Sequence, residues 1–190
     1  MEPAVYLVVG FPGTGKYTVG KELVAQLGEK ARLVDNHHIN NAVFGVLPVD
    51  GVTPLPDAVW DLVIDVRRAV LTAVEKLAPT DFSFVFTNFI HTAEADDPPV
   101  VAYVSRLERI ARARGTHLRL VRLTCEREEL LRRVVRPDRT TRLKATSAEW
   151  VAEVFDAHEI YEPTGIATLT LDVTRLDPAT AASVVLSHPW

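Results

Sequence analysis

The sequence predicts an α/β protein in which five parallel strands form one sheet between two layers of helices. Short apolar runs, typical of buried strands, occur at residues 5–9, 31–34, 82–86, 118–123 and 168–173. Segments with helical spacing of apolar residues lie between them, and such alternation produces a parallel sheet that is covered on both faces. The 190 residues contain no repeat, low-complexity segment or linker, so we expect one domain over residues 1–190.

The first predicted strand leads directly into a glycine-rich turn. The strand ends at Gly10, and the turn runs to Lys16. Val19, Leu23 and Leu27 then recur every four residues, which marks one face of a helix. A strand, a glycine loop, a lysine and a helix in this order are the context of a phosphate-binding loop.

This turn has the chemistry that phosphate binding requires. Glycines let backbone N–H groups converge on one anion, and the helix N-terminus adds unsatisfied donors. Lys16 supplies a positive charge for the β- and γ-phosphates. We expect the nucleotide to bind at Gly10, Pro12, Gly13, Thr14, Gly15, Lys16, Tyr17 and Thr18. The alternative is a strand-to-helix turn that binds nothing.

One position departs from the phosphate-loop pattern. The residue after the lysine is normally a Ser or Thr that binds Mg²⁺, whereas this chain has Tyr17 there and Thr18 one place later. The form Gly-x-Pro-Gly-x-Gly-Lys-x-Thr resembles nucleoside monophosphate kinases, in which the threonine contacts phosphate.

The remaining elements follow from the same kinds of pattern. Helices are identified by apolar spacing of three and four, strands by β-branched runs, and loops by glycine and proline clusters. In order, they are a strand at 31–34, a polar stretch at 36–41, a loop at 45–56, a helix at 59–77, a strand at 82–86, a helix from Asp97 to Gly115, a strand at 118–123, a helix at 126–135, a helix from a capping box of Thr146 and Glu149 to His158, a strand at 168–173 and a helix from Asp177.

Polar residues follow several of the predicted strands. They are the glycine loop, Asp35, the pair Thr87 and Asn88, and the residues after Val173. In parallel sheets the ligand binds beyond the carboxyl ends of the strands. These residues therefore indicate a catalytic crevice at that edge.

Composition limits the classes of function. The apolar content of 47% and charged content of 24% are those of an ordinary globular protein, and the net charge of −4 opposes a nucleic-acid surface. No apolar run approaches the ~20 residues of a membrane span. Cys125 is the only cysteine, which fits a reducing compartment, and we expect it to be a small buried hydrophobe. We expect a cytoplasmic protein that uses no membrane, with Trp60 and Trp150 in the core.

Nearly the whole chain resembles the small P-loop kinases of the shikimate kinase and gluconate kinase group. The resemblance rests on the phosphate loop, on Asp35 at the end of the second strand, and on a tail that runs from Glu149-Trp150 through Tyr161-Glu162 to the last strand. It implies the strand order 2-3-1-4-5, an arginine-bearing lid at about 132–145, and transfer of the γ-phosphoryl group of ATP to a hydroxyl, with Mg²⁺ as cofactor. Antibiotic phosphotransferases of similar build also carry an aspartate at the Asp35 position.

Two departures separate the chain from shikimate kinases. Those enzymes have Asp-x-Asp after the second strand and a glycine run after the third, where this chain has Asp35-Asn36-His37 and Thr87-Asn88-Phe89. Arg67 and Arg68 are the candidates for the substrate-reading arginine of that group. The resemblance therefore implies the fold and the phosphoryl chemistry, and it leaves the acceptor unidentified.

The candidate catalytic residues are Lys16, Asp35, Arg136 and Arg139. Asp35 suits a general base, or a Mg²⁺ ligand acting through water beside Thr18, but it also suits a cap on the next helix. Arg136 and Arg139 flank Pro137 and suit a phosphate clamp.

Other candidates carry stronger alternatives. Arg132 and Arg142 are lesser candidates for the phosphate clamp, and Glu128 and Arg132 have helical ion-pair spacing that would make the latter a solvated charge. His37, His38 and Asn88 are candidates for substrate contact. Adjacent histidines rarely face the same way, so at most one of the two is expected to be functional.

The sequence as a whole predicts an ATP-dependent kinase that acts on a hydroxyl of a small molecule and is a monomer or weak homodimer. Two alternatives stay open. Tyr17 and the missing second carboxylate would fit a nucleotide-binding switch or sensor without phosphotransfer. The basic segment 132–142 would fit a kinase of nucleic-acid ends, although the net acidity opposes it.

Overall fold

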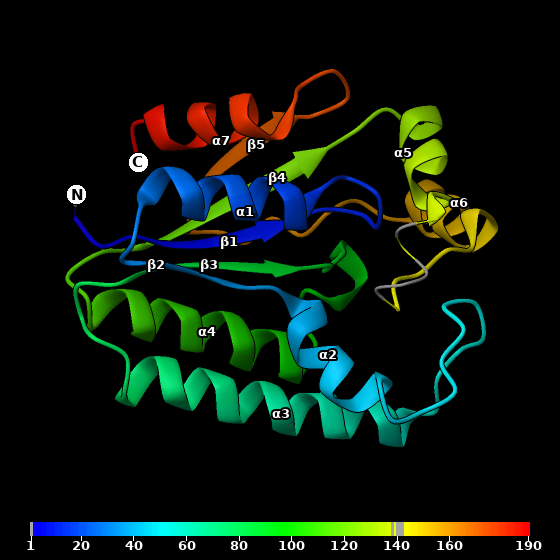
Figure 1. Cartoon of the computed structure of the whole chain (residues 1–190), viewed down its shortest axis with the longest axis horizontal. Helices are drawn as coiled ribbons and strands as arrows, with labels where there is room; N and C mark the ends of the chain where they lie inside the picture. Colours follow the sequence, from blue (N-terminus) through cyan, green and yellow to red (C-terminus); the bar gives the residue numbers. More distant parts are fainter. Residues whose placement is uncertain (1, 138, 140–142) are drawn as a thin grey trace.

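A computed structural model describes residues 2–137, 139 and 143–190. Its five strands form one all-parallel sheet with the order β2-β3-β1-β4-β5, which confirms the predicted fold class and strand order (Figure 1). In chain order the elements are β1 Val5–Val9, α1 Lys16–Leu27, β2 Ala31–Val34, α2 Asn36–Phe44, α3 Asp57–Lys76, β3 Ser83–Asn88, the 3-10 turn η1 Thr92–Glu94, α4 Pro98–Arg112, β4 Leu118–Thr124, α5 Arg127–Val134, α6 Ala148–Ala157, β5 Ala167–Asp172 and α7 Pro178–Ser187.

The alternation of side chains along the strands produces two apolar layers. In β1, Tyr6 and Val8 pack with α1 and α7, whereas Val5, Leu7 and Val9 join the core beneath α4, α5 and α6. All five residues are buried, as expected for a strand with neighbours on both sides and helices on both faces. Figure 1 shows α1 and α7 on one side of the sheet and α3 and α4 on the other.

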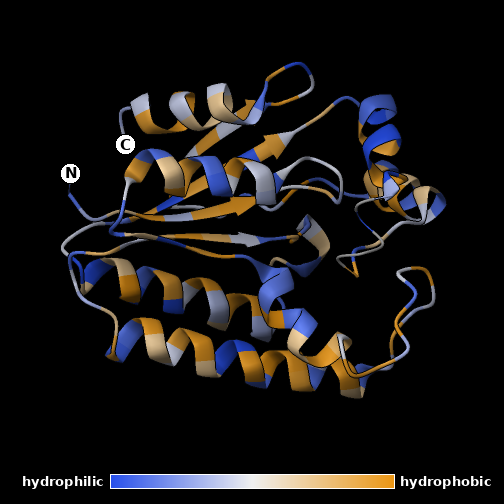
Figure 2. Ribbon diagram, viewed as in Figure 1, coloured by the Kyte–Doolittle hydropathy of each residue, from blue (hydrophilic) through white to orange (hydrophobic). Residues whose placement is uncertain are grey.

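A smaller apolar cluster joins α2 to α3. Ile39, Val43 and Phe44 of α2 pack against Val63 of α3, and Leu143 of the segment after α5 packs on the same cluster. Figure 2 shows hydrophobic colour at the end of α2 and in parts of the loop 45–56. This cluster places α2 beside the carboxyl edge of the sheet.

Three local expectations differ from the structure. The polar stretch 36–41 belongs to helix α2, because the Asp35 carboxylate caps it by accepting the His37 N–H at 3.1 Å. The cap of α6 is Ser147, which accepts the Trp150 N–H, and not Thr146. Finally, α4 ends at Arg112 instead of reaching Gly115.

Within the described residues, none of the helices has the length and apolar character needed to cross a membrane.

Candidate active site

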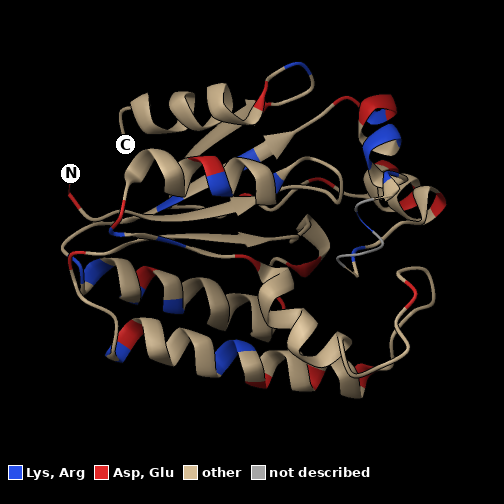
Figure 3. Cartoon of the chain, in the orientation of Figure 1, with Lys and Arg blue, Asp and Glu red and all other residues tan. Residues whose placement is uncertain are grey.

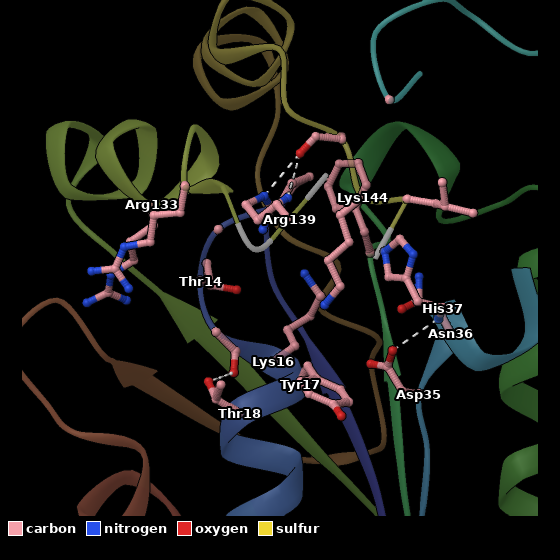
Figure 4. A pocket seen from close by; sticks show the side chains of 18 of the residues that line it. Thr14, Lys16, Tyr17, Thr18, Asp35, Asn36, His37, Arg133, Arg139 and Lys144 are labelled. Carbon is pink, nitrogen blue, oxygen red and sulfur yellow. Dashed lines mark hydrogen bonds between the residues drawn. The ribbon is translucent and has the colours of Figure 1, made fainter. Parts of the chain in front are cut away.

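A cavity of about 840 Å³ opens at the carboxyl ends of the strands. The glycine loop forms its centre, the start of α2 and the loop before α3 form one half, and α5 with the residues after β5 forms the other. Figure 4 shows Lys16 between Asp35 and His37 on one side and Arg133 on the other. Most of the predicted site residues therefore face one cavity, as the parallel sheet requires.

The glycine loop has backbone geometry that other residues would strain. Gly15 is the N-cap of α1 with φ of 92°, and Gly13 has φ of 101°. A Cβ at Gly13 would lie 2.9 Å from the carbonyl oxygen of Leu130 in α5. The loop can therefore pack against α5 only with glycine at this position.

Lys16 lies at the centre of the cavity with its amino group turned onto its own loop. Nζ donates to the carbonyl oxygens of Gly10 at 2.6 Å and Phe11 at 2.9 Å. Burial is the main cause that lowers the pKa of Lys16 to about 7, and the nearby positive charges of Arg139 and Lys144 lower it further. Three cations thus converge on one place, which favours a polyanionic ligand.

The threonines and the tyrosine of the loop have different environments. The Thr14 hydroxyl is buried and donates to Phe11 O at 2.9 Å, while the Thr18 hydroxyl is exposed and donates to Gly15 O at 2.8 Å. Tyr17 stacks under the ammonium of Lys144, 4.8 Å from its ring centroid. The ring that replaces the usual Ser or Thr therefore supports a cation at the mouth of the cavity.

Asp35 is buried, with 2% of its surface exposed. Its Oδ2 caps α2, and its Oδ1 accepts the hydroxyl of Thr87, which the register of β2 on β3 brings alongside. Each carboxylate oxygen keeps a second lone pair, because an ionised carboxylate has about four acceptor sites. The capping role considered from the sequence is present, and the role as a base stays a prediction.

The two adjacent histidines face different surroundings. His37 lines the cavity, and burial together with the positive charge of Lys144 lowers its pKa to about 4, so it is neutral at pH 7. His38 is exposed, and its ring meets Tyr17 edge to face, with 6.0 Å between the centroids. Of the pair, the structure brings only His37 into the cavity.

Asn88 is buried outside the cavity lining. Its Oδ1 accepts the N–H of Phe89 at 2.9 Å, so the side chain serves the turn after β3. Phe89, the next residue, lines the cavity instead.

Two arginines of the basic segment pair with a carboxylate, and two others line the cavity. Arg132 and Arg133 both pair with Glu129 at 2.6 Å, so the predicted partner Glu128 was wrong by one residue. Arg136 and Arg139 line the cavity, and Arg139 donates twice to the carbonyl oxygen of Ala145, at 3.1 and 2.7 Å. Arg142 lies outside the described residues.

Several lining residues were not identified from the sequence. Arg133 donates to the carbonyl oxygens of Val173 and Thr174 and so holds α5 against the loop after β5. Trp60 and Trp150, expected in the core, are 43% and 42% exposed and line the cavity. By contrast, Cys125 is buried as expected, with 7% of its surface exposed.

The expected Mg²⁺ can be compared with the donors present. No group of three His, Cys, Asp or Glu side chains suited to hold a metal occurs in the described ranges. Mg²⁺ usually binds through one or two protein ligands together with phosphate oxygens and water, so few protein donors are required. The Thr18 hydroxyl and the free lone pairs of Asp35 fit this kind of coordination.

Sequence comparison gives no match to a protein-family model or to a curated protein. Solved structures do match over nearly the whole chain. A protein from Chloroflexus aurantiacus described as a candidate kinase covers 100% of both chains, with a TM-score of 0.67 and 17% identity. A gluconokinase from Sinorhizobium meliloti covers 97% of this chain and 92% of its own, with a TM-score of 0.54 and 19% identity.

A shikimate kinase from Acinetobacter baumannii covers 98% of this chain and 92% of its own, with a TM-score of 0.53 and 16% identity. At these identities the comparisons describe architecture. The chain has the fold of the shikimate and gluconate kinase-like P-loop proteins, which confirms the resemblance seen in the sequence.

Proposed function

We propose that this chain is an ATP-dependent phosphotransferase that moves the γ-phosphoryl group of ATP to a hydroxyl of a small molecule. One observation carries the proposal. Lys16, Arg139 and Lys144 converge on the glycine loop, in the same cavity that the Asp35 carboxylate faces. A cationic cradle for phosphates beside a carboxylate suits the attack of a hydroxyl on phosphorus.

The residues divide the work as follows. The loop amides and Lys16 bind the β- and γ-phosphates, and Arg136 and Arg139 stabilise the charge that spreads over the transferred group. The acceptor oxygen bonds to the γ-phosphorus as the bond from that phosphorus to the bridging oxygen breaks. ADP leaves with that electron pair, and the hydroxyl proton passes to Asp35. Mg²⁺, held near Thr18 and Asp35, would neutralise phosphate charge.

The half of the cavity between α5 and the loop after β5 suits the rest of the nucleotide. Arg133 is fixed there by Glu129 and by two carbonyl oxygens, so its guanidinium is pre-organised. A planar guanidinium stacks well on an aromatic base.

A second candidate is a nucleotide-binding switch without phosphotransfer. It is favoured by Asp35, because both carboxylate oxygens already accept hydrogen bonds, and by Tyr17 at the usual metal-ligand position. The nucleic-acid-end kinase gains little support, since Arg132 and Arg133 of the basic segment share an ion pair with Glu129.

Acceptor-dependent ATP turnover separates these functions. ADP release is measured with and without a panel of hydroxyl compounds, and ATP affinity is measured by calorimetry on the same protein. We expect ADP release that requires an acceptor and is lost in Lys16→Met. ATP binding without any acceptor-dependent release would support the switch and contradict the kinase.

A further inference from the structure

The half of the cavity beside Asp35 is apolar. Its lining includes Phe44, Val49, Val52, Leu55 and Trp60, which come from the end of α2, the following loop and α3. Phe44 and Trp60 meet edge to face, with 5.7 Å between their ring centroids. Two further rings, Phe89 and Trp150, line the same cavity. We call the surface formed by residues 36–55 and Trp60 the acceptor half.

The acceptor half contains no positive charge. Residues 36–56 include no Lys or Arg, and their single charged residue is Asp50. The Asp50 carboxylate is occupied by the N–H groups of Val52 and Thr53 and by the Thr53 hydroxyl, so it holds the turn of the loop. Figure 3 shows the uncharged colour over α2 and most of this loop.

The arginines considered from the sequence as substrate-reading groups lie elsewhere. Arg67 stacks on the ring of Tyr103 at 5.3 Å, and Arg68 pairs with Asp65 at 2.7 Å. Neither lines the cavity. Arg139 and Lys144 lie close to Lys16, where the phosphates are expected, and Lys144 also acts on His37 at the edge of the acceptor half.

Two neutral side chains of the acceptor half, Asn40 and His37, each carry a buried polar atom without a hydrogen-bond partner among the described residues. Asn40 lines the cavity, is 5% exposed, and its Oδ1 has no hydrogen-bond partner among the described residues. The same holds for Nδ1 of His37. An unpaired buried polar atom is unfavourable, so a ligand hydroxyl that hydrogen-bonds there gains affinity.

From these observations we infer that the acceptor is an uncharged hydroxyl compound with an apolar body, and not a carboxylate-bearing polyol. That this ligand accepts a phosphoryl group rests on the proposed function, whereas its chemical class is argued from the cavity lining alone. A carboxylate placed among Phe44, Val52 and Trp60 would be desolvated by apolar side chains, and residues 36–56 supply no Lys or Arg to pair with it.

A matched pair of probes tests whether the acceptor half prefers an uncharged ligand to a carboxylate. Naphthylethanol and naphthylacetate share their ring system and differ mainly in the carboxylate, and their naphthalene fluorescence reports binding to the full chain without ATP. We expect the alcohol to bind at least ~10-fold more tightly than the acid, because a buried unpaired charge is costly. Equal or tighter binding of the acid would overturn the inference.

Two variants localise the effect. Trp60→Ala should weaken the alcohol by roughly tenfold through lost aromatic contact, while Leu62→Ala, 54% exposed on the same helix and outside the cavity, is the matched control. Val52→Arg, at a position 62% exposed, should improve binding of the acid, since it supplies the missing cation. Equal effects of the two alanine variants would place the probe elsewhere and contradict the inference.

The proposed kinase function and the inferred class of acceptor can be contradicted separately. If the protein transfers the γ-phosphoryl group of ATP to gluconate or a similar acid, the proposed function stands and the inference about the acceptor is wrong. If the alcohol binds in the Trp60-dependent way but no phosphoryl group moves from ATP to any alcohol, the ligand class stands and the kinase fails.

Discussion

Replacing Lys16 by methionine should change the stability of the protein with a sign that depends on pH. Folding lowers the pKa of Lys16 from 10.5 to about 7. Between these values the unfolded chain holds a proton that the folded chain has lost, so this lysine makes the free energy of unfolding rise with pH. Methionine keeps the length of the side chain and removes the titration.

The size of the change in the free energy of unfolding follows from the pKa shift of Lys16 and from the two hydrogen bonds that its Nζ donates. At pH 7 the unfavourable charging of Lys16 amounts to about 4 kcal/mol, at 1.36 kcal/mol for each pKa unit. The bonds to Gly10 O and Phe11 O offset about 1 kcal/mol each. Lys16→Met should therefore raise the free energy of unfolding by about 2 kcal/mol at pH 7, and lower it by about 2 kcal/mol above pH 10.5.

Urea denaturation followed by circular dichroism, at a series of pH values from 7 to 11, measures both signs. Lys76→Met is the control, because this lysine is exposed in the last turn of α3 and its loss should change stability by less than about 0.5 kcal/mol. A Lys16→Met protein that is less stable than wild type by the same amount at every pH would refute the reasoning. The lysine would then be charged at little cost in the folded chain.

The remaining predictions concern turnover and the loop backbone. Asp35→Asn should leave ATP affinity in calorimetry unchanged and cut phosphotransfer by roughly 10²–10⁴-fold, whereas Thr87→Val, which keeps the carboxylate, should lose far less; because Asn is also a good cap, unimpaired turnover of Asp35→Asn would assign Asp35 to capping alone. Arg136→Ala and Arg139→Ala should each lower turnover at saturating ATP and acceptor by at least ~10²-fold, and full turnover in both would make them solvated charges. Gly13→Ala should destabilise the fold by about 1–3 kcal/mol, because it combines a positive φ with a clash on α5; an unchanged melting temperature would contradict this.

The sheet and the conformation of the glycine loop could be predicted because their determinants are local. Each strand is a run of apolar residues between breaks, and the loop is a contiguous motif. Helix α2 was missed because its first turn is polar, although Ile39, Val43 and Phe44 have helical spacing and were an available signal. Ser147 and Thr146 can both cap a helix, and the sequence does not distinguish neighbours with the same chemistry.

The walls of the cavity could be predicted less well, because residues distant in sequence form them. Trp60 follows Val59 of the buried stripe, so it lies about 100° away around the helix, and this offset could have placed it outside the core. Arg133 had no such signal. Its role depends on the position of β5 beside β4, which no local pattern contains.

The construction of the acceptor half has a consequence for the evolution of this chain. Everything in it except Trp60 comes from one continuous stretch that lies outside the sheet, and the N–H of Thr146 reaches this stretch at Gly51 O, 3.2 Å away. No described strand and no residue of the glycine loop belongs to this stretch, so exchanges at lining positions such as Val52 alter the apolar surface and not the sheet, whereas a Cβ at Gly51 would lie 2.6 Å from Lys144 O. If the chain is the kinase proposed above, changes in this one stretch would alter which acceptor binds while the glycine loop stays the same.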